Sequence, residues 1–129
     1  MLESIRQFLD QPLLAYLSTI DRAGYPHTVP VWFGVDGDEI IFPTMASRAR
    51  LKHIAADPRG AVAIGGSPAE GEGYLLKGAL RIAEDDRALR HGVIRRYLSG
   101  EQAEGLIAMS EQSPYVLVRL TPTNVTRVR

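Results

Sequence analysis

The amino-acid sequence predicts a mainly β protein, an antiparallel barrel or sandwich with flanking helices. Roughly six or seven segments are rich in β-branched and aromatic residues, as strands are. Short turn signals join several of these segments, and strands joined by short turns pair antiparallel. Helices do not alternate regularly with the strands, so the pattern does not favour a doubly wound parallel sheet.

The N-terminal part predicts one helix, one strand and one turn. Apolar residues recur at helical spacing from Leu2 to Leu9, and the helix should end before Pro12. Residues 13–20 are apolar and few, as in a buried strand. The segment from Asp21 to Gly24 is typical of a turn in which glycine supplies a positive φ.

A central hairpin follows. Residues 29–33 and 39–42 have the composition of strands, and Asp36-Gly37 between them is a strong signal for a two-residue turn. The second strand is expected to run through Thr44 towards Ser47.

Ser47 is predicted to cap a short helix that ends at Asp57-Pro58. Arg48 and Arg50 then fall in its first turn, where a cation opposes the helix dipole at a cost of about 0.3–1 kcal/mol. A bound anion would reverse this effect, because the free N–H groups and both guanidinium groups would hold it together. The alternative is that both arginines are simply solvated.

The C-terminal half predicts four further strands and two helices. Strands are expected at 61–64, 74–82 and 115–120, and a surface loop rich in glycine at 65–73. A helix should begin at Glu84 and run through Leu98, followed by a shorter helical piece at 101–109. The remaining residues predict a turn at 121–124 and a last strand at 125–128.

Composition excludes several classes of protein. The 129 residues are expected to form a single domain, 1–129, and their fifteen basic and fifteen acidic residues give no net attraction to nucleic acid. The chain has no cysteine, hence no disulfide and no cysteine-based metal site. It also has no apolar run that would span a membrane and no signal peptide, so a cytoplasmic location is expected.

The order and spacing of four short motifs resemble the pyridoxamine-phosphate-oxidase-like flavin-binding split barrels, especially their flavin/deazaflavin-dependent branch. The motifs are Gly-Tyr-Pro-His-x-x-Pro-Val-Trp-Phe at 24–33, Asp-Gly-Asp at 36–38, Arg-x-Arg at 48–50 and Asp-Pro-Arg at 57–59. The resemblance implies a six-stranded antiparallel Greek-key split barrel. It also implies a homodimer with two cofactor sites at its interface.

The same resemblance implies where a cofactor would bind. Arg50, at a position that is commonly lysine in relatives, and Arg48 would bind the cofactor phosphate. Val29, Pro30 and Val31 would lie along the flavin ring, although ordinary barrel-core positions are the alternative. Thr44 would hydrogen-bond the phosphate or the ring, and Lys77 and Tyr74 of the partner subunit would complete the pocket. His27 would lie near the cofactor, and a structural role is its alternative. Trp32 and Phe33 are interpreted as core or dimer-interface anchors.

No catalytic side-chain constellation is evident, which suits a protein whose cofactor carries the chemistry. The first hypothesis is therefore an oxidoreductase that uses FMN or the deazaflavin coenzyme to transfer a hydride to or from a small organic substrate. The alternative is a non-catalytic flavin- or tetrapyrrole-binding protein. Oxidation of vitamin B6 itself is not expected, because no C-terminal segment resembles the one that completes that site in true oxidases.

Overall fold

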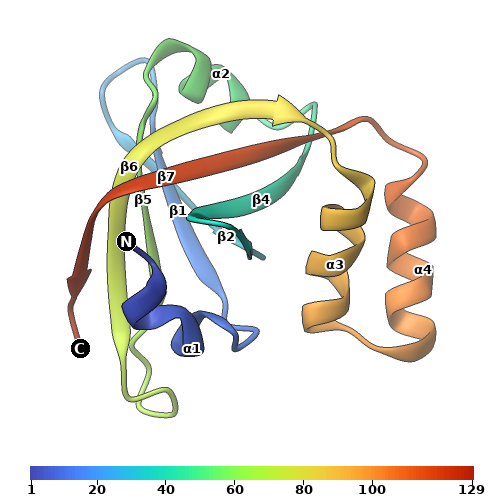
Figure 1. Ribbon diagram of the computed structural model, residues 1–129. Helices are drawn as coiled ribbons and strands as arrows, with labels where there is room; N and C mark the ends of the chain where they lie inside the picture. Colours follow the sequence, from blue (N-terminus) through green and yellow to red (C-terminus); the bar gives the residue numbers. More distant parts are fainter.

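The computed structural model describes residues 1–129 and contains one seven-stranded sheet in which every neighbouring pair of strands is antiparallel (Figure 1). The strands are β1 (Ala15–Ile20), β2 (Pro26–Val31), β3 (Gly34–Asp36), β4 (Glu39–Met45), β5 (Arg59–Gly65), β6 (Gly73–Glu84) and β7 (Tyr115–Arg127). Their order in the sheet is β2-β1-β5-β6-β7-β4-β3. The helices are η1 (Glu3–Ile5), α1 (Arg6–Leu9), α2 (Arg50–Ala56), α3 (Arg87–Tyr97) and α4 (Gly100–Ser110).

The two longest strands, β6 and β7, hold the split barrel together. They run side by side and arch across the whole sheet (Figure 1). The first half of β6 pairs with β5, whereas the first half of β7 pairs with β4. Each long strand therefore belongs to both halves of the barrel.

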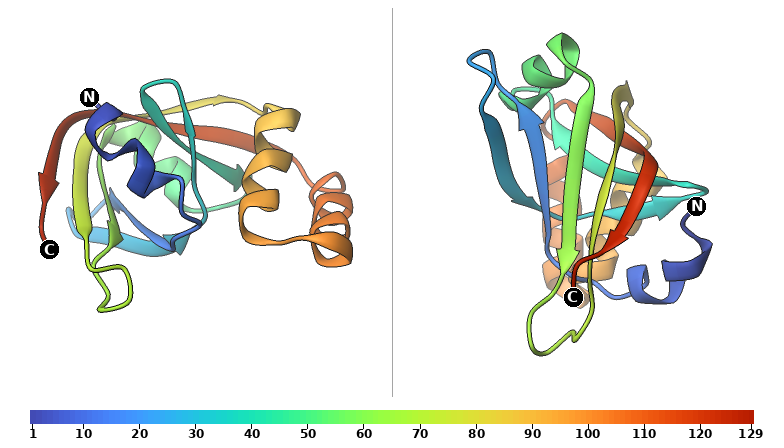
Figure 2. Two further views of the ribbon diagram at one scale, coloured as in Figure 1. Left: turned by 60° about the horizontal axis from the view of Figure 1, so that its bottom comes forward. Right: turned by 90° about the vertical axis from the view of Figure 1, so that its left-hand side faces the viewer.

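The barrel core consists of 18 buried side chains, contributed mainly by alternate strand positions. The helices η1 and α1 add Ile5, Phe8 and Leu9 to it, and Leu2 directly before η1 adds a fourth side chain, which confirms the apolar stripe expected there. The loop between β5 and β6 projects from one end of the barrel (Figure 2). None of the helices is both long and apolar enough to cross a membrane.

The helices α3 and α4 form a pair on one side of the sheet (Figure 1). Val93 of α3 packs against Ile41 of β4 and Leu117 of β7. A second small cluster, of Ile94, Ala103 and Ile107, joins α3 to α4. The helix pair is thus attached to the outer side of the barrel wall, where β4 and β7 meet.

The central hairpin differs from its prediction. The turn is Gly37-Asp38 rather than Asp36-Gly37, with Gly37 at φ 61° as its first central residue. Its strands are β3 and β4, because Asp36 pairs with Glu39. The strand that ends at Val31 pairs instead with β1. The short β3 is the reason that the sheet has one strand more than the six that the family resemblance implies, whereas the residue patterns indicated six or seven.

The start of α2 was also predicted wrongly. Ser47 does not cap the helix, which begins at Arg50 with Ala49 before it. The backbone N–H of Arg48 donates to the carbonyl of Met45 at 3.1 Å and closes a tight turn that takes the place of a first helical turn. Arg48 therefore precedes the helix, Arg50 is its first residue, and only seven residues follow the helical path.

The last strand is longer than expected, because the predicted turn at 121–124 is part of β7. The register shifts by one residue opposite Lys77 and Gly78, and this bulge accommodates Pro122. A Cβ on Gly78 would collide with the carbonyl oxygen of Thr121, so glycine is needed where the two strands approach.

Candidate functional site

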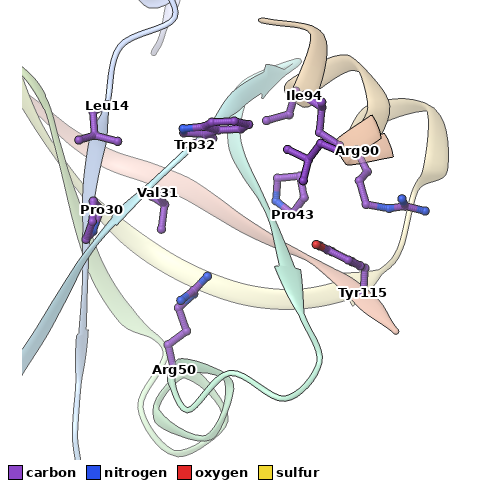
Figure 3. A pocket seen from close by; sticks show the side chains of 11 residues that line it. Leu14, Pro30, Val31, Trp32, Pro43, Arg50, Arg90, Ile94 and Tyr115 are labelled. Carbon is purple, nitrogen blue, oxygen red and sulfur yellow. The ribbon is translucent and has the colours of Figure 1, made fainter. Parts of the chain in front are cut away.

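A cavity of about 490 Å³ lies between the edge of the barrel and the helix pair (Figure 3). Its walls come from β2, β4, α2, α3, α4 and β7, together with Leu14 just before β1 and Trp32 just after β2, so segments far apart in the sequence form it. The lining residues are Leu14, Pro30, Val31, Trp32, Pro43, Arg50, Arg90, Val93, Ile94, Leu106 and Tyr115. Most are apolar, and two arginines are its only charged members.

Arg50 extends from the first residue of α2 into this cavity (Figure 3). The side chain is half-buried, and its Nε is buried without a hydrogen-bond partner in the chain. Burial, and secondly repulsion from Arg48, lower the pKa of the Arg50 guanidinium. A buried donor on a cation is costly to leave unpaired, so the arrangement favours an anion beside Arg50.

Arg90 is different, because its charge is balanced inside the protein. Its Nε and Nη2 donate to the two oxygens of Asp85, each at 3.1 Å, and Nη2 also donates to Glu111 at 3.2 Å. Nη1 donates to the hydroxyl of Ser110. The hydrogen bond with Asp85 is the main reason that the pKa of Arg90 is raised. Arg50 is thus the cation of the cavity that has no carboxylate partner.

The edge of β2 forms another wall. β2 is the outermost strand on its side of the sheet, and Pro30 and Val31 line the cavity. Pro26 and Pro30 are an even number of residues apart, so both prolines share one edge of the strand. Proline has no N–H to give to a ladder, which places these nitrogens on the unpaired edge. The carbonyls of that edge, and the N–H of Thr28, are left for other partners.

The structure therefore brings together three residues that the sequence indicated, Pro30, Val31 and Arg50. The side chain of Val29 lies on the opposite face of β2 from that of Pro30 and packs against the barrel core. Thr44 is buried in β4 and does not line the cavity; its hydroxyl donates to the carbonyl of Phe42 at 2.9 Å.

Two other candidates lie outside the cavity wall. Arg48 is exposed. His27 is half-buried, with an unpartnered buried Nδ1, and its ring stands edge-on to that of His53 at 4.8 Å between centroids. His53 Nδ1 in turn lies 3.0 Å from the hydroxyl of Thr19. The two histidines form a pair of their own.

Lys77 and Tyr74 lie on β6 and line two other pockets of about 340 Å³ each. The Tyr74 hydroxyl donates to Glu72 at 2.7 Å. Neither residue reaches the cavity within one chain, so their assignment to the site of a partner subunit stays a prediction.

Sequence reasoning missed much of the apolar wall. Trp32 was expected to anchor a core or an interface, yet it lines the cavity. Its position directly after β2 was a usable signal, because the preceding two residues were already placed at the site. Nothing in the local sequence indicated Val93, Ile94 or Leu106, which depend on how α3 and α4 pack.

Fold and cavity together describe a small antiparallel split barrel whose cavity is mostly apolar and contains one cation, Arg50, without a carboxylate partner. The chain belongs to the pyridoxamine 5'-phosphate oxidase family, whose family model, described as Pyridoxamine 5'-phosphate oxidase, matches residues 1–129. No curated protein matches the chain.

Solved structures share the fold at low sequence identity. An F420 reductase is 21% identical with a TM-score of 0.75, covering 94% of each chain. A conserved hypothetical protein from Mycobacterium tuberculosis is 24% identical with a TM-score of 0.78, covering 98% of this chain and 84% of that one. A heme binding protein from Mycobacterium smegmatis is 22% identical with a TM-score of 0.73, and the match covers 98% of this chain and 52% of the other.

Proposed function

We propose that this protein is an oxidoreductase that binds FMN, or the related deazaflavin coenzyme, at the interface of a homodimer and transfers a hydride to or from a small organic substrate. The observation that carries the proposal is the buried, unpartnered Nε of Arg50 in a mostly apolar cavity whose other cation, Arg90, is paired. A phosphate beside it would satisfy that donor and balance the charge. The F420 reductase among the structural neighbours supports this class of cofactor.

The residues present fit such a cofactor. Arg50 would hold the phosphate, and the unpaired edge of β2 beside Pro30 and Val31 would hydrogen-bond the polar edge of the ring. The bound cofactor would supply the hydride chemistry. The apolar wall of Val93, Ile94 and Leu106 would exclude water from the reacting atoms. The cavity wall contains no carboxylate and no histidine, and Tyr115 is its one side chain with a hydroxyl, so the protein's main part is binding and orientation.

A second copy of the chain would complete the site. Leu14, which lines the cavity, and the neighbouring Tyr16 are apolar side chains that remain 44% and 47% exposed. Tyr16 pairs with Pro30 across β1 and β2, so the exposed side chains lie beside the proposed ring position. A partner that covers them would close the open side of the cavity and bring its own residues to the cofactor.

Two observations favour a second function, storage or transport without turnover. The heme binding protein among the neighbours has the same fold, and the cavity lacks a catalytic side-chain pair. A non-catalytic flavin- or tetrapyrrole-binding protein is therefore the alternative.

Absorption spectroscopy distinguishes the two functions. The purified protein is titrated in turn with FMN, deazaflavin coenzyme and haem, and the complexes that form are then mixed with NAD(P)H or, for reduced deazaflavin, with a quinone. Saturable binding of FMN or deazaflavin followed by bleaching or recovery of its band is the expected result. Tight binding without any redox change would support the storage protein, and binding of haem alone would overturn the proposal.

A further inference from the structure

Trp32 and Tyr97 form a stacked pair at the end of the cavity that lies away from Arg50. Their rings are 4.6 Å apart between centroids and within 5° of parallel. The Tyr97 hydroxyl donates to the carbonyl of Leu13 at 2.7 Å and accepts a hydrogen bond from the N–H of Phe33 at 3.2 Å. Two hydrogen bonds therefore hold the Tyr97 hydroxyl in place, and the held ring supports the indole that stacks on it.

The two faces of the Trp32 indole have different surroundings. Tyr97 covers one face and is not part of the cavity wall, whereas Trp32 is. Figure 3 shows the indole edge-on, with Arg50 on the opposite side of the cavity and its guanidinium pointing towards the ring. The face of Trp32 that is not stacked on Tyr97 thus looks into the cavity.

The surroundings of that open face are apolar and uncharged. Ile94 lies beside the indole (Figure 3), and the apolar side chains of Val93, Leu106 and Leu14 also line the cavity. The nearby cation, Arg90, is neutralised by Asp85 and Glu111. A flat, uncharged group would gain both stacking and apolar burial here, while a charged group would lose its hydration without finding a partner.

We propose that Trp32 is a specificity-determining residue that takes a planar, uncharged, conjugated ring of the substrate on its open face, and that Tyr97 positions it. The identification of this ring as the substrate rests on the proposed function, which places the anionic cofactor on the side of Arg50. The preference for a flat ring over a globular group of similar size rests only on the stacked pair. An indole that is already immobilised loses little further freedom when a ring stacks on it.

The test uses two uncharged ketones of similar size, planar 2-methyl-1,4-naphthoquinone and globular camphor. Their dissociation constants are measured by equilibrium dialysis for the FMN-loaded protein without reductant, and the chain has no cysteine that would trap the quinone covalently. Trp32→Leu is expected to weaken naphthoquinone binding about three- to tenfold, since it removes the π face but keeps apolar bulk. Trp32→Phe should restore most of it, and the affinities for camphor and FMN should stay unchanged.

Tyr97→Phe keeps the stacked ring but removes both hydrogen bonds of the hydroxyl. We expect it to weaken naphthoquinone binding less than Trp32→Leu does and to leave camphor binding unchanged. Equal losses for both ketones, or none for naphthoquinone, would overturn the proposal. If Trp32→Leu does not fold, the wild-type protein still decides. The wild-type protein must then bind naphthoquinone more tightly than camphor in the same dialysis, and equal affinities would overturn the proposal.

The same titrations are repeated on the protein without FMN, which separates the two proposals. If FMN does not bind the wild-type protein at all, the proposed function fails whatever naphthoquinone does. If FMN binds but naphthoquinone binds the wild type and Trp32→Leu equally well, only the specificity assignment fails.

Discussion

Arg50 and Arg90 line the same cavity, but only Arg90 has carboxylate partners, with its Nε 3.1 Å from Asp85 Oδ1. The buried Nε of Arg50 has no partner. Two arginines of the same charge thus have separate roles: one belongs to the framework and the other is available to a ligand. This difference leads to opposite expectations when each is replaced.

Replacing Arg50 should weaken cofactor binding through the phosphate. A hydrogen bond to a charged group contributes about 1.5–3 kcal/mol, so we expect Arg50→Ala to weaken FMN binding roughly tenfold to a hundredfold. Arg50→Lys should lose less, because it keeps the charge without the planar fork. Titrations with FMN and with riboflavin, which lacks the phosphate, measure the effect.

The matched control is Lys52→Ala, which removes an exposed cation from the same helix and should leave both affinities unchanged. In the absence of cofactor, Arg50→Ala should leave the stability unchanged or raise it, because it removes a partly buried, uncompensated charge. Equal losses for FMN and riboflavin would mean that Arg50 acts through the fold.

Replacing Arg90 should instead destabilise the fold. The side chain is 4% exposed and joins Asp85, Glu111 and Ser110, so Arg90→Ala would leave two carboxylates without their main buried partner. We expect a loss of about 2–4 kcal/mol, discounted from the range for a fully buried pair because both carboxylates are 30% exposed. Urea unfolding monitored by circular dichroism measures it.

Arg95→Ala is the control on the same helix. The ion pair of Arg95 with Glu104 is largely exposed, so its removal should cost less than about 1 kcal/mol. Similar losses for the two variants would contradict the structural role assigned to Arg90.

The sequence predicted the strands better than the places where they end. Residues 61–64 and 74–82 are strands because their apolar, β-branched composition suits a half-buried pleated surface, and this preference is local. The errors at Ser47 and Thr121 share one cause, since long-range pairing overrode a local signal. The N–H of Ala46 donates to the carbonyl of Pro114, and the bulge opposite Gly78 admits Pro122 into a continuous strand.

The residues of the candidate site also fall into two groups, those that local sequence predicts and those that depend on long-range packing. Arg50, Pro30 and Val31 were predictable from motif spacing and lie together in the cavity. The wall formed by α3 and α4 was not predictable, because helical periodicity shows which face of a helix is apolar but not which strand it will cover.

Acid should destabilise the protein partly through Glu111. Hydrogen bonds, first from Arg87 and then from Arg90 and His91, lower the pKa of this carboxyl from its ordinary value of 4.5 to about 2. A depressed carboxyl pKa contributes stability that is fully present above pH 4.5 and is lost as the pH falls towards 2. We therefore expect the urea midpoint to fall through this window, and Glu111→Gln to flatten the fall.

Other carboxyl groups contribute to the same pH dependence, because the hydrogen bond with Arg59 lowers the pKa of Asp57 to about 2 and the pKa values of Asp38 and Glu39 are lowered as well. Glu111→Gln should thus remove only part of the pH dependence, while it lowers the midpoint at pH 6. Parallel pH profiles for wild type and variant would show that Glu111 is not linked to folding.

If a homodimer covers the open side of the cavity, a charged side chain introduced on β1 should dissociate it into monomers. Tyr16 is 47% exposed beside Pro30, so Tyr16→Glu would place a carboxylate in the proposed interface and should shift the molecular mass measured by light scattering towards the monomer. Because the partner is proposed to complete the site, FMN affinity should fall in parallel. Met109→Glu is the control, since Met109 is 66% exposed on α4 and should leave the mass unchanged. A wild-type protein that is a monomer at micromolar concentration would rule out the dimer. If Met109→Glu alone dissociated the dimer, the interface would lie at the helix pair instead, and the β2 edge would be open to solvent.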